Sequence, residues 1–165
     1  MKIGILSDTH NHRINLLTAL EQFRQHEIDT LIHCGDMTDP ELAPEMAGFR
    51  VICAFGNGDI ASGEIRQALL AMNPENYAGL VYKGRIGGAR IAVTHGHMPS
   101  LLNELLRSGE NDYVFKGHSH QWKDERIGAT RLINPGALGG LHREPRQVCV
   151  LDLDSGKANF IKISE

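Results

Sequence analysis

The sequence predicts an α/β protein in which two sheets pack face to face with helices outside. In the first third of the chain, three short apolar runs each end in a loop that carries Asp, His or Asn, as buried parallel strands do. Helical stretches follow these runs. The second half instead contains strand pairs joined by tight turns, which is typical of antiparallel pairing. A parallel half followed by a more antiparallel half favours two packed sheets.

In the first half, strands alternate with helices. The apolar runs predict strands over residues 3–6, 29–33 and 51–55. Apolar residues recur at helical spacing in residues 13–26, and residues 61–72 are also predicted to be helical. Pro40 is expected to open a short helix as its first residue, with Asp39 as the cap.

The second half is rich in strands. Gly87-Gly88 predicts a two-residue hairpin turn between strands over residues 80–86 and 89–94. A helix is expected over residues 99–107, with its leucines on one face. The remaining predicted elements are a strand over 113–115, a hairpin through Gly128-Ala129, and a closing hairpin of residues 148–153 with 159–163.

Length and composition limit which classes of function are possible. A chain of 165 residues is expected to form one domain over residues 1–165, with room for a core. The net charge of -3 does not indicate nucleic-acid binding by bulk positive charge, but leaves open a phosphorylated substrate held by metal ions. No membrane span or signal peptide is expected. Three cysteines, mostly in apolar runs, indicate buried thiols in a reducing cytoplasm: Cys34, Cys53 and Cys149.

Histidines and carboxylates gather where the predicted strands end. Asp8 and His10 follow the first strand, where an extended backbone would point both side chains the same way, as half of a metal site. The alternative for Asp8 is a helix cap. Five such loops supply seven candidate ligands: Asp8, His10, Asp36, Asn57, His95, His118 and His120. These groups suit manganese, iron, zinc, cobalt or nickel, and seven are too many for one tetrahedral site. Two adjacent metal sites are therefore expected.

The loops also follow a known order of motifs. They read Asp8-x-His10, Gly35-Asp36-x-x-Asp39, Gly56-Asn57-x-Asp59, His95-Gly96-His97 and Gly117-His118-x-His120, with a later Asn134-Pro135-Gly136. In this order the chain resembles the calcineurin-like metallophosphoesterase superfamily over nearly its whole length. It looks most like the small YfcE-type phosphodiesterase branch.

The resemblance implies a fold and a mechanism. The fold would be the four-layer α/β/β/α sandwich of two mixed sheets flanked by helices. One metal would be held by Asp8, His10 and His120, the other by Asn57, His95 and His118, with Asp36 bridging both. A metal-bridging hydroxide would attack phosphorus in a small phosphoester. Manganese is the first expectation for the metal, and a homodimer is suggested.

One position departs from the family pattern. Many members carry histidine where this chain has Gly58, and that histidine is held to protonate the leaving oxygen. Asp59, His97 or a metal-bound water could take over this role, although Asp59 could equally cap the next helix. His97 could instead hold the substrate phosphate or support neighbouring ligands. The candidate catalytic residues are therefore Asp36, Asn57 and His97.

Other functions remain open. His33 lies within a predicted strand and reads as a core histidine. On the same metal site, a phosphomonoesterase or protein phosphatase is the alternative, and Gly58 and the short loops count against it. A non-catalytic scaffold like the retromer subunit Vps29 is the alternative outside enzymes. That relative has lost part of its ligand set, whereas this chain keeps all seven positions.

Overall fold

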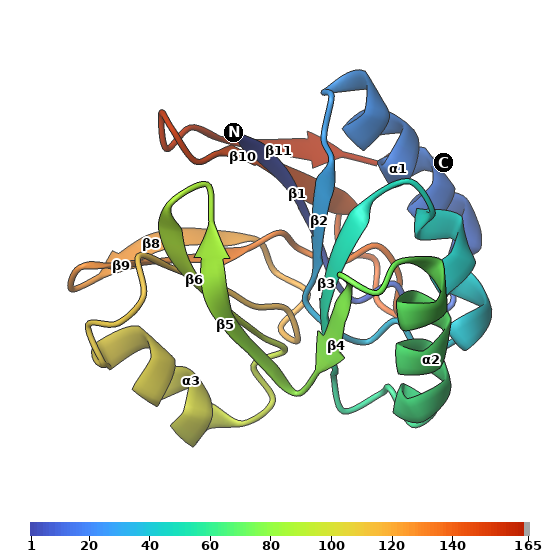
Figure 1. Cartoon of the computed structure of the whole chain (residues 1–165), viewed down its shortest axis with the longest axis horizontal. Coiled ribbons are helices and arrows are strands. Elements are labelled where there is room, and N and C mark those ends of the chain that lie inside the picture. Colours follow the sequence, from blue (N-terminus) through green and yellow to red (C-terminus); the bar gives the residue numbers. More distant parts are fainter. Residues whose placement is uncertain (164–165) are drawn as a thin grey trace.

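The computed structural model describes residues 1–163, which form two mixed sheets of six and five strands (Figure 1). The strand order of the first sheet is β11-β10-β1-β2-β3-β4, and that of the second is β5-β6-β7-β9-β8. Two packed mixed sheets are what the change in pattern between the two halves of the sequence predicts.

The first sheet places three loops at one edge. Its strands are β1 (Lys2–Leu6), β2 (Thr30–His33), β3 (Arg50–Ala54), β4 (Tyr77–Gly79), β10 (Gln147–Asp152) and β11 (Ala158–Lys162). Strands β1 to β4 are parallel, and β10 and β11 extend the sheet by antiparallel pairing on the other side of β1. The carboxyl ends of β1, β2 and β3 therefore lie together.

The second sheet has a parallel centre and antiparallel edges. Its strands are β5 (Val81–Ile86), β6 (Ala89–Thr94), β7 (Tyr113–Phe115), β8 (Lys123–Ile127) and β9 (Thr130–Asn134). Strands β6, β7 and β9 are parallel, whereas β5 and β8 pair antiparallel with their neighbours. The predicted Gly87-Gly88 hairpin is confirmed, because Ile86 pairs with Ala89 across it.

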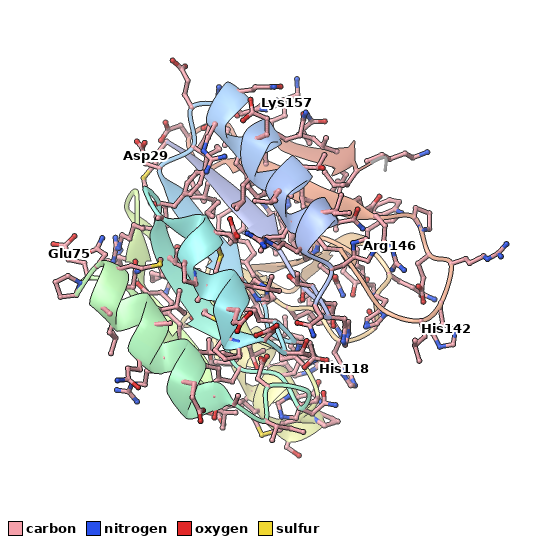
Figure 2. The ribbon with its side chains drawn as sticks, turned by 90° about the vertical axis from the view of Figure 1, so that its right-hand side faces the viewer. Asp29, Glu75, His118, His142, Arg146 and Lys157 are labelled. Atoms are coloured by element: carbon pink, nitrogen blue, oxygen red, sulfur yellow. The ribbon has the colours of Figure 1, made fainter. Side chains whose placement is uncertain are left out.

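Helices cover the outer face of each sheet. Figure 2 shows α1 (Arg13–Gln25), the 3₁₀ helix η1 (Pro40–Met46) and α2 (Ser62–Met72) in front of the first sheet. The second sheet is covered by α3 (Pro99–Arg107), which packs Leu105 and Leu106 against Ala92 and Val114. Asp39 caps η1 as predicted, since its Oδ1 accepts a hydrogen bond of 2.9 Å from the Glu41 amide.

Three apolar layers hold the four structural layers together. One lies between the sheets, where Ile5 and Ile52 meet Ile91 and Phe115. The second packs α1, η1 and α2 on the first sheet, and the third packs α3 on the second sheet. The α/β/β/α sandwich is therefore confirmed. Among residues 1–163 no helix is long and apolar enough to cross a membrane.

The structure corrects the sequence interpretation at two places. Strand β4 was not predicted, and the chain leaves it at Leu80, which is 49% exposed, to enter the second sheet as β5. Asp59 does not cap α2, whose N-cap is Ala61. Its carboxylate accepts hydrogen bonds from two backbone amides of the loop after β2 and from the Gly56 amide of its own loop.

Candidate metal centre

Strand ends from both sheets bring the predicted ligands to one edge of the sandwich. The loop after β1 carries Asp8 and His10, the loop after β2 carries Asp36, and the loop after β3 carries Asn57. From the second sheet, β6 delivers His95, and β7 delivers His118 and His120. Parallel pairing in both sheets is what makes these ends coincide.

Two overlapping groups of ligand atoms form at this edge. The ligand atoms of Asp8, His10 and His120 all lie within 4.8 Å of one another, as do those of Asp8, Asp36 and His95. Five of the seven predicted ligands are thus brought together, and Asp8 belongs to both groups. The first group matches the ligand set that the resemblance implies for one metal.

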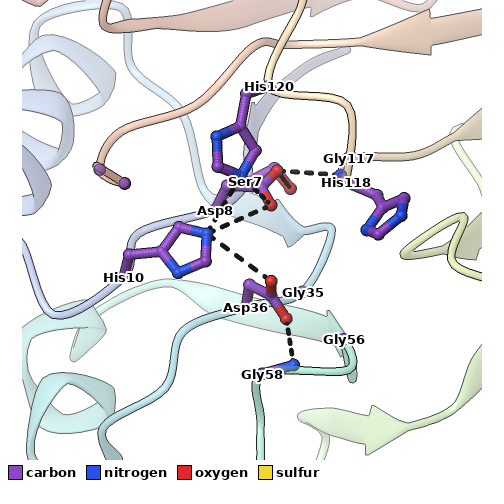
Figure 3. A network of polar contacts seen from close by, with 12 residues as sticks. Ser7, Asp8, His10, Gly35, Asp36, Gly56, Gly58, Gly117, His118 and His120 are labelled. Atoms are coloured by element: carbon purple, nitrogen blue, oxygen red, sulfur yellow. Dashed lines mark hydrogen bonds and ion pairs between the residues drawn. The ribbon is translucent and has the colours of Figure 1, made fainter. Parts of the chain in front are cut away.

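The two carboxylates lie between the imidazoles (Figure 3). Asp8 Oδ1 is 3.2 Å from His120 Nε2 and 3.7 Å from His10 Nε2. Asp36 Oδ2 is 3.6 Å from His10 Nε2 and 3.4 Å from His95 Nε2. Since Asp36 faces an imidazole of each group, its position is compatible with a ligand shared by two ions.

The other predicted site residues lie at the rim. Asn57 and His118 are exposed, and His97 is partly buried. The His118 ring centroid is 5.0 Å from that of His95, and the His118 amide donates 3.1 Å to Asp8 Oδ2. The rings of His95 and His97 have centroids 5.5 Å apart. Neither His97 nor His118 belongs to the two groups in the described part of the chain.

Polar contacts away from the centre orient two of the imidazoles. His95 Nδ1 lies 2.7 Å from the Cys34 carbonyl, which can only accept, so Nδ1 carries the proton and Nε2 presents its lone pair to the centre. On His120, Nε2 faces Asp8 while Nδ1 lies 3.9 Å from a Glu144 carboxylate oxygen. Such outer partners are typical of metal-binding histidines.

Two buried atoms at the centre test whether a metal fits. Asp8 Oδ1 and His95 Nε2 are buried and have no hydrogen-bond partner among residues 1–163. A buried polar atom without a partner is costly, and a bound cation removes that cost. Oxygen and nitrogen donors suit the first-row divalent metals. The residues present therefore fit the expected metal.

The backbone at the ligands is strained, and at Asp8 and His10 it is left-handed instead of extended as the sequence predicted. Five of the seven predicted ligands have φ in the left-handed region: Asp8 (52°), His10 (43°), Asp36 (56°), His118 (71°) and His120 (58°). This conformation costs side-chain-bearing residues about 1–2 kcal/mol each. Strain that clusters in this way is characteristic of functional sites, where it sets the direction of side chains.

Glycines of the motifs make room for the carboxylates. A Cβ on Gly117 would lie 1.8 Å from Ser7 Oγ and 2.6 Å from Asp8 Oδ2. A Cβ on Gly56 would lie 2.1 Å from Asp36 Oδ1. These two glycines therefore leave the space that Asp8 and Asp36 occupy, each from a different loop.

The electrostatics favour negative carboxylates beside positive charge. Burial raises the pKa of Asp36, but the interaction with the nearby His95 imidazole outweighs burial and brings that pKa to about 2. The same balance lowers the pKa of Asp8, through His10 and Ser7. Asp8 in turn raises the pKa of His10, and the two carboxylates raise the pKa of His95 against burial. A cation is thus stabilised between Asp8 and Asp36.

Several supporting contacts were not predicted from the sequence. Asp59 accepts hydrogen bonds from three amides, those of Asp36 (2.9 Å), Thr38 (2.8 Å) and Gly56 (2.8 Å), and so ties the loops after β2 and β3 together. The Gly58 amide donates 2.7 Å to Asp36 Oδ1. These contacts involve backbone groups, which leave no signal in the sequence.

His33 behaves as the predicted core histidine. It is fully buried, its Nδ1 accepts 3.1 Å from the Gly35 amide, and its Nε2 lies 2.9 Å from Thr9 Oγ1. Burial lowers its pKa to about 4, so the ring is neutral near pH 7. It supports the turn before Asp36 without reaching the centre.

Residues 1–156 match the family model of the calcineurin-like phosphoesterase superfamily domain. Among relatives of the whole chain, phosphodiesterase MJ0936 of Methanocaldococcus jannaschii is 33% identical over 156 residues, covering 93% of this chain and 94% of that protein.

Solved structures of other proteins share this fold. An archaeal phosphodiesterase superposes with a TM-score of 0.93 at 32% identity, over 98% of this chain and 99% of that one. Two more distant structures share the fold alone. They are YfcE of E. coli (TM-score 0.69, 19% identity, 99% and 100% covered) and a single mutant of Vps29 from Entamoeba histolytica (0.68, 18%, 99% and 100%).

Proposed function

Because this chain belongs to the calcineurin-like phosphoesterase superfamily, we propose that it is a metal-dependent phosphodiesterase acting on small phosphoesters. The observation that carries the proposal is the pair of overlapping ligand groups that share Asp8. The 33% identity with an archaeal phosphodiesterase supports diesters as the substrate class. Three free, buried cysteines are compatible with a reducing cytoplasm, and a homodimer remains part of the expectation.

The proposal keeps the predicted ligands for two divalent ions, with manganese as the first choice and iron, zinc, cobalt or nickel as alternatives. Asp36 would be a ligand of both ions, Asp8, His10 and His120 would hold one of them, and Asn57, His95 and His118 would hold the other. When bound, two such ions supply positive charge for the phosphoryl oxygens and lower the pKa of the attacking water.

Residues that are not metal ligands also have roles in the proposed reaction. Burial and the charge of His95 lower the pKa of His97, so its ring is neutral near pH 7 and offers one N–H to a phosphoryl oxygen. Asp59 does not act as the leaving-group acid in this proposal, since both its oxygens accept backbone amides. With glycine at position 58, esters whose leaving group is stable as an anion are favoured.

The test is hydrolysis of bis(p-nitrophenyl) phosphate with and without metal. Wild-type protein with Mn²⁺ should cleave this diester, and EDTA should abolish cleavage. Asp36→Asn should lower the rate by roughly 100-fold, because it weakens a shared ligand. Asp39→Asn, which keeps the exposed cap of η1, is the matched control and should leave the rate unchanged.

Two alternative functions give different results in this assay. A phosphomonoesterase would cleave p-nitrophenyl phosphate faster than the diester. A scaffold like Vps29 would cleave neither with any of the five metals. Turnover that persists in EDTA would contradict metal dependence outright.

A further inference from the structure

Two cavities open on either side of His120. The first has a volume of about 490 Å³ and lies between the turn at residues 10–12 and the loop at residues 140–142. The second, also about 490 Å³, lies between Trp122 and the segment 144–147. His120 lines both, and it belongs to the ligand group of Asp8 and His10. Both volumes are in the range of small-ligand pockets.

The loop of residues 139–146 contributes to the walls of both cavities and is braced by hydrogen bonds. Figure 2 shows His142 on this loop, which stands out from the rest of the ribbon, with Arg146 on its inner side. The Arg146 guanidinium donates to the carbonyls of Gly140 (2.9 Å) and His142 (2.8 Å), and also to that of Gly139. The Gly139 amide donates 2.8 Å to the Asp8 carbonyl, which fixes the loop to the metal centre.

The loop packs closely on the imidazole between the cavities. A Cβ on Gly140, whose φ is +106°, would lie 2.9 Å from His120 Cε1. Residues 140–142 face the first cavity, and residues 144, 145 and 147 face the second. Whatever enters either cavity therefore lies beside a proposed metal ligand.

Each cavity has an exposed apolar side chain on its wall. Leu141 in the first is fully exposed, and Trp122 in the second is 59% exposed. The Trp122 ring packs against Phe160, with ring centroids 5.1 Å apart, and this contact fixes its orientation. Single exposed apolar residues are common, but here each lines a cavity that His120 also lines.

We propose that these two cavities hold the two ester arms of the substrate, with a planar arm on Trp122 and the other arm beneath Leu141. The inference rests on the proposed phosphodiesterase function and deepens it. A phosphodiester centred at the metal site has two arms, and a cavity of about 490 Å³ has room for one arm. A phosphomonoester would leave one cavity empty. The substrate class is therefore a diester with two bulky arms, at least one of them planar.

Binding can be tested without catalysis. Trp122 is the sole tryptophan of the sequence, so its fluorescence reports directly on the second cavity. Diphenyl phosphate added to the Mn²⁺-loaded protein should change this fluorescence saturably, and dimethyl phosphate should not. Equal responses to both compounds, or none to either, would overturn the inference.

Kinetics test the two arms separately. Bis(p-nitrophenyl) phosphate and p-nitrophenyl methyl phosphate share a leaving group and differ in the retained arm. Trp122→Ala and Leu141→Ala should each raise KM for the first ester by about 5- to 10-fold, through lost ring and apolar contacts. Only one of the two variants should raise KM for the methyl ester, and that variant marks the cavity of the leaving group. The control is Leu80→Ala, because Leu80 is also an exposed apolar residue but lines neither cavity.

The outcomes separate this inference from the proposed function. If wild-type protein cleaves both diesters but either variant keeps KM for the bis-aryl ester within twofold, the two-cavity assignment is wrong and the phosphodiesterase stands. If wild-type protein cleaves neither diester with any of the five metals, both are wrong. If Trp122→Ala changes the oligomeric state measured by sedimentation and leaves KM unchanged, the aromatic surface is an interface between copies.

Discussion

Replacing Asp59 by asparagine should destabilise both loops that carry Asp36 and Asn57. The Asp59 carboxylate is 5% exposed and accepts three backbone hydrogen bonds, two at Oδ2 and one at Oδ1. An asparagine has one acceptor oxygen, so its NH₂ group must face at least one backbone N–H. A hydrogen bond to a charged group contributes about 1.5–3 kcal/mol, and an unsatisfied buried donor costs about 1–3 kcal/mol.

From these magnitudes we expect Asp59→Asn to lower the free energy of unfolding by about 2–4 kcal/mol. The assay is urea denaturation of the metal-free protein near pH 7, followed by circular dichroism. Asp39→Asn is the control: it also changes Asp to Asn beside a backbone amide, but the site is exposed and asparagine caps equally well. Calorimetric titration should show weaker Mn²⁺ binding by Asp59→Asn than by the wild-type protein, and unchanged binding by Asp39→Asn. A loss of less than about 0.5 kcal/mol would refute the role given to Asp59.

Two further predictions concern Gly58 and His33. A Cβ on Gly58, whose φ lies outside the left-handed region, would meet Asp36 Oδ1 at 2.9 Å, so Gly58→Ala should weaken Mn²⁺ binding about 10-fold by calorimetry, whereas Gly63→Ala, in open space, should not. Gly58→His should show the same loss. Because burial lowers the pKa of His33 to about 4, the unfolded chain binds a proton between pH 6.5 and 4 that the native state does not. Stability should therefore fall by about 3 kcal/mol as the pH drops through this window, and His33→Asn should flatten the fall in urea denaturation.

The fold was largely predictable because its signals are local. Apolar runs and helical spacing placed every strand of the described chain except β4, whose three residues pair at a sheet edge with β3. That pairing depends on the distant β3, and the change of sheet at Leu80 has no local pattern. The Asp59 cap was wrong for a similar reason, since its partners lie on the loop after β2 and at Gly56.

The candidate site was predictable as a set of side chains and unpredictable as a geometry. Residue types at strand ends identified Asp8, His10, Asp36, His95 and His120, which the structure brings together. Their left-handed backbone, and the carbonyl and amide groups that orient them, depend on contacts between loops far apart in the sequence. Backbone groups are the same in every residue, so no sequence pattern reports them.

The most direct test of a two-ion centre is anomalous diffraction from crystals loaded with Mn²⁺. We expect two manganese peaks per chain, one among Asp8, His10 and His120 and one beside His95, with Asp36 touching both. Asp36→Asn should weaken or remove at least one of the peaks. A single peak in the wild-type protein, or two peaks that leave Asp36 uncoordinated, would contradict the account.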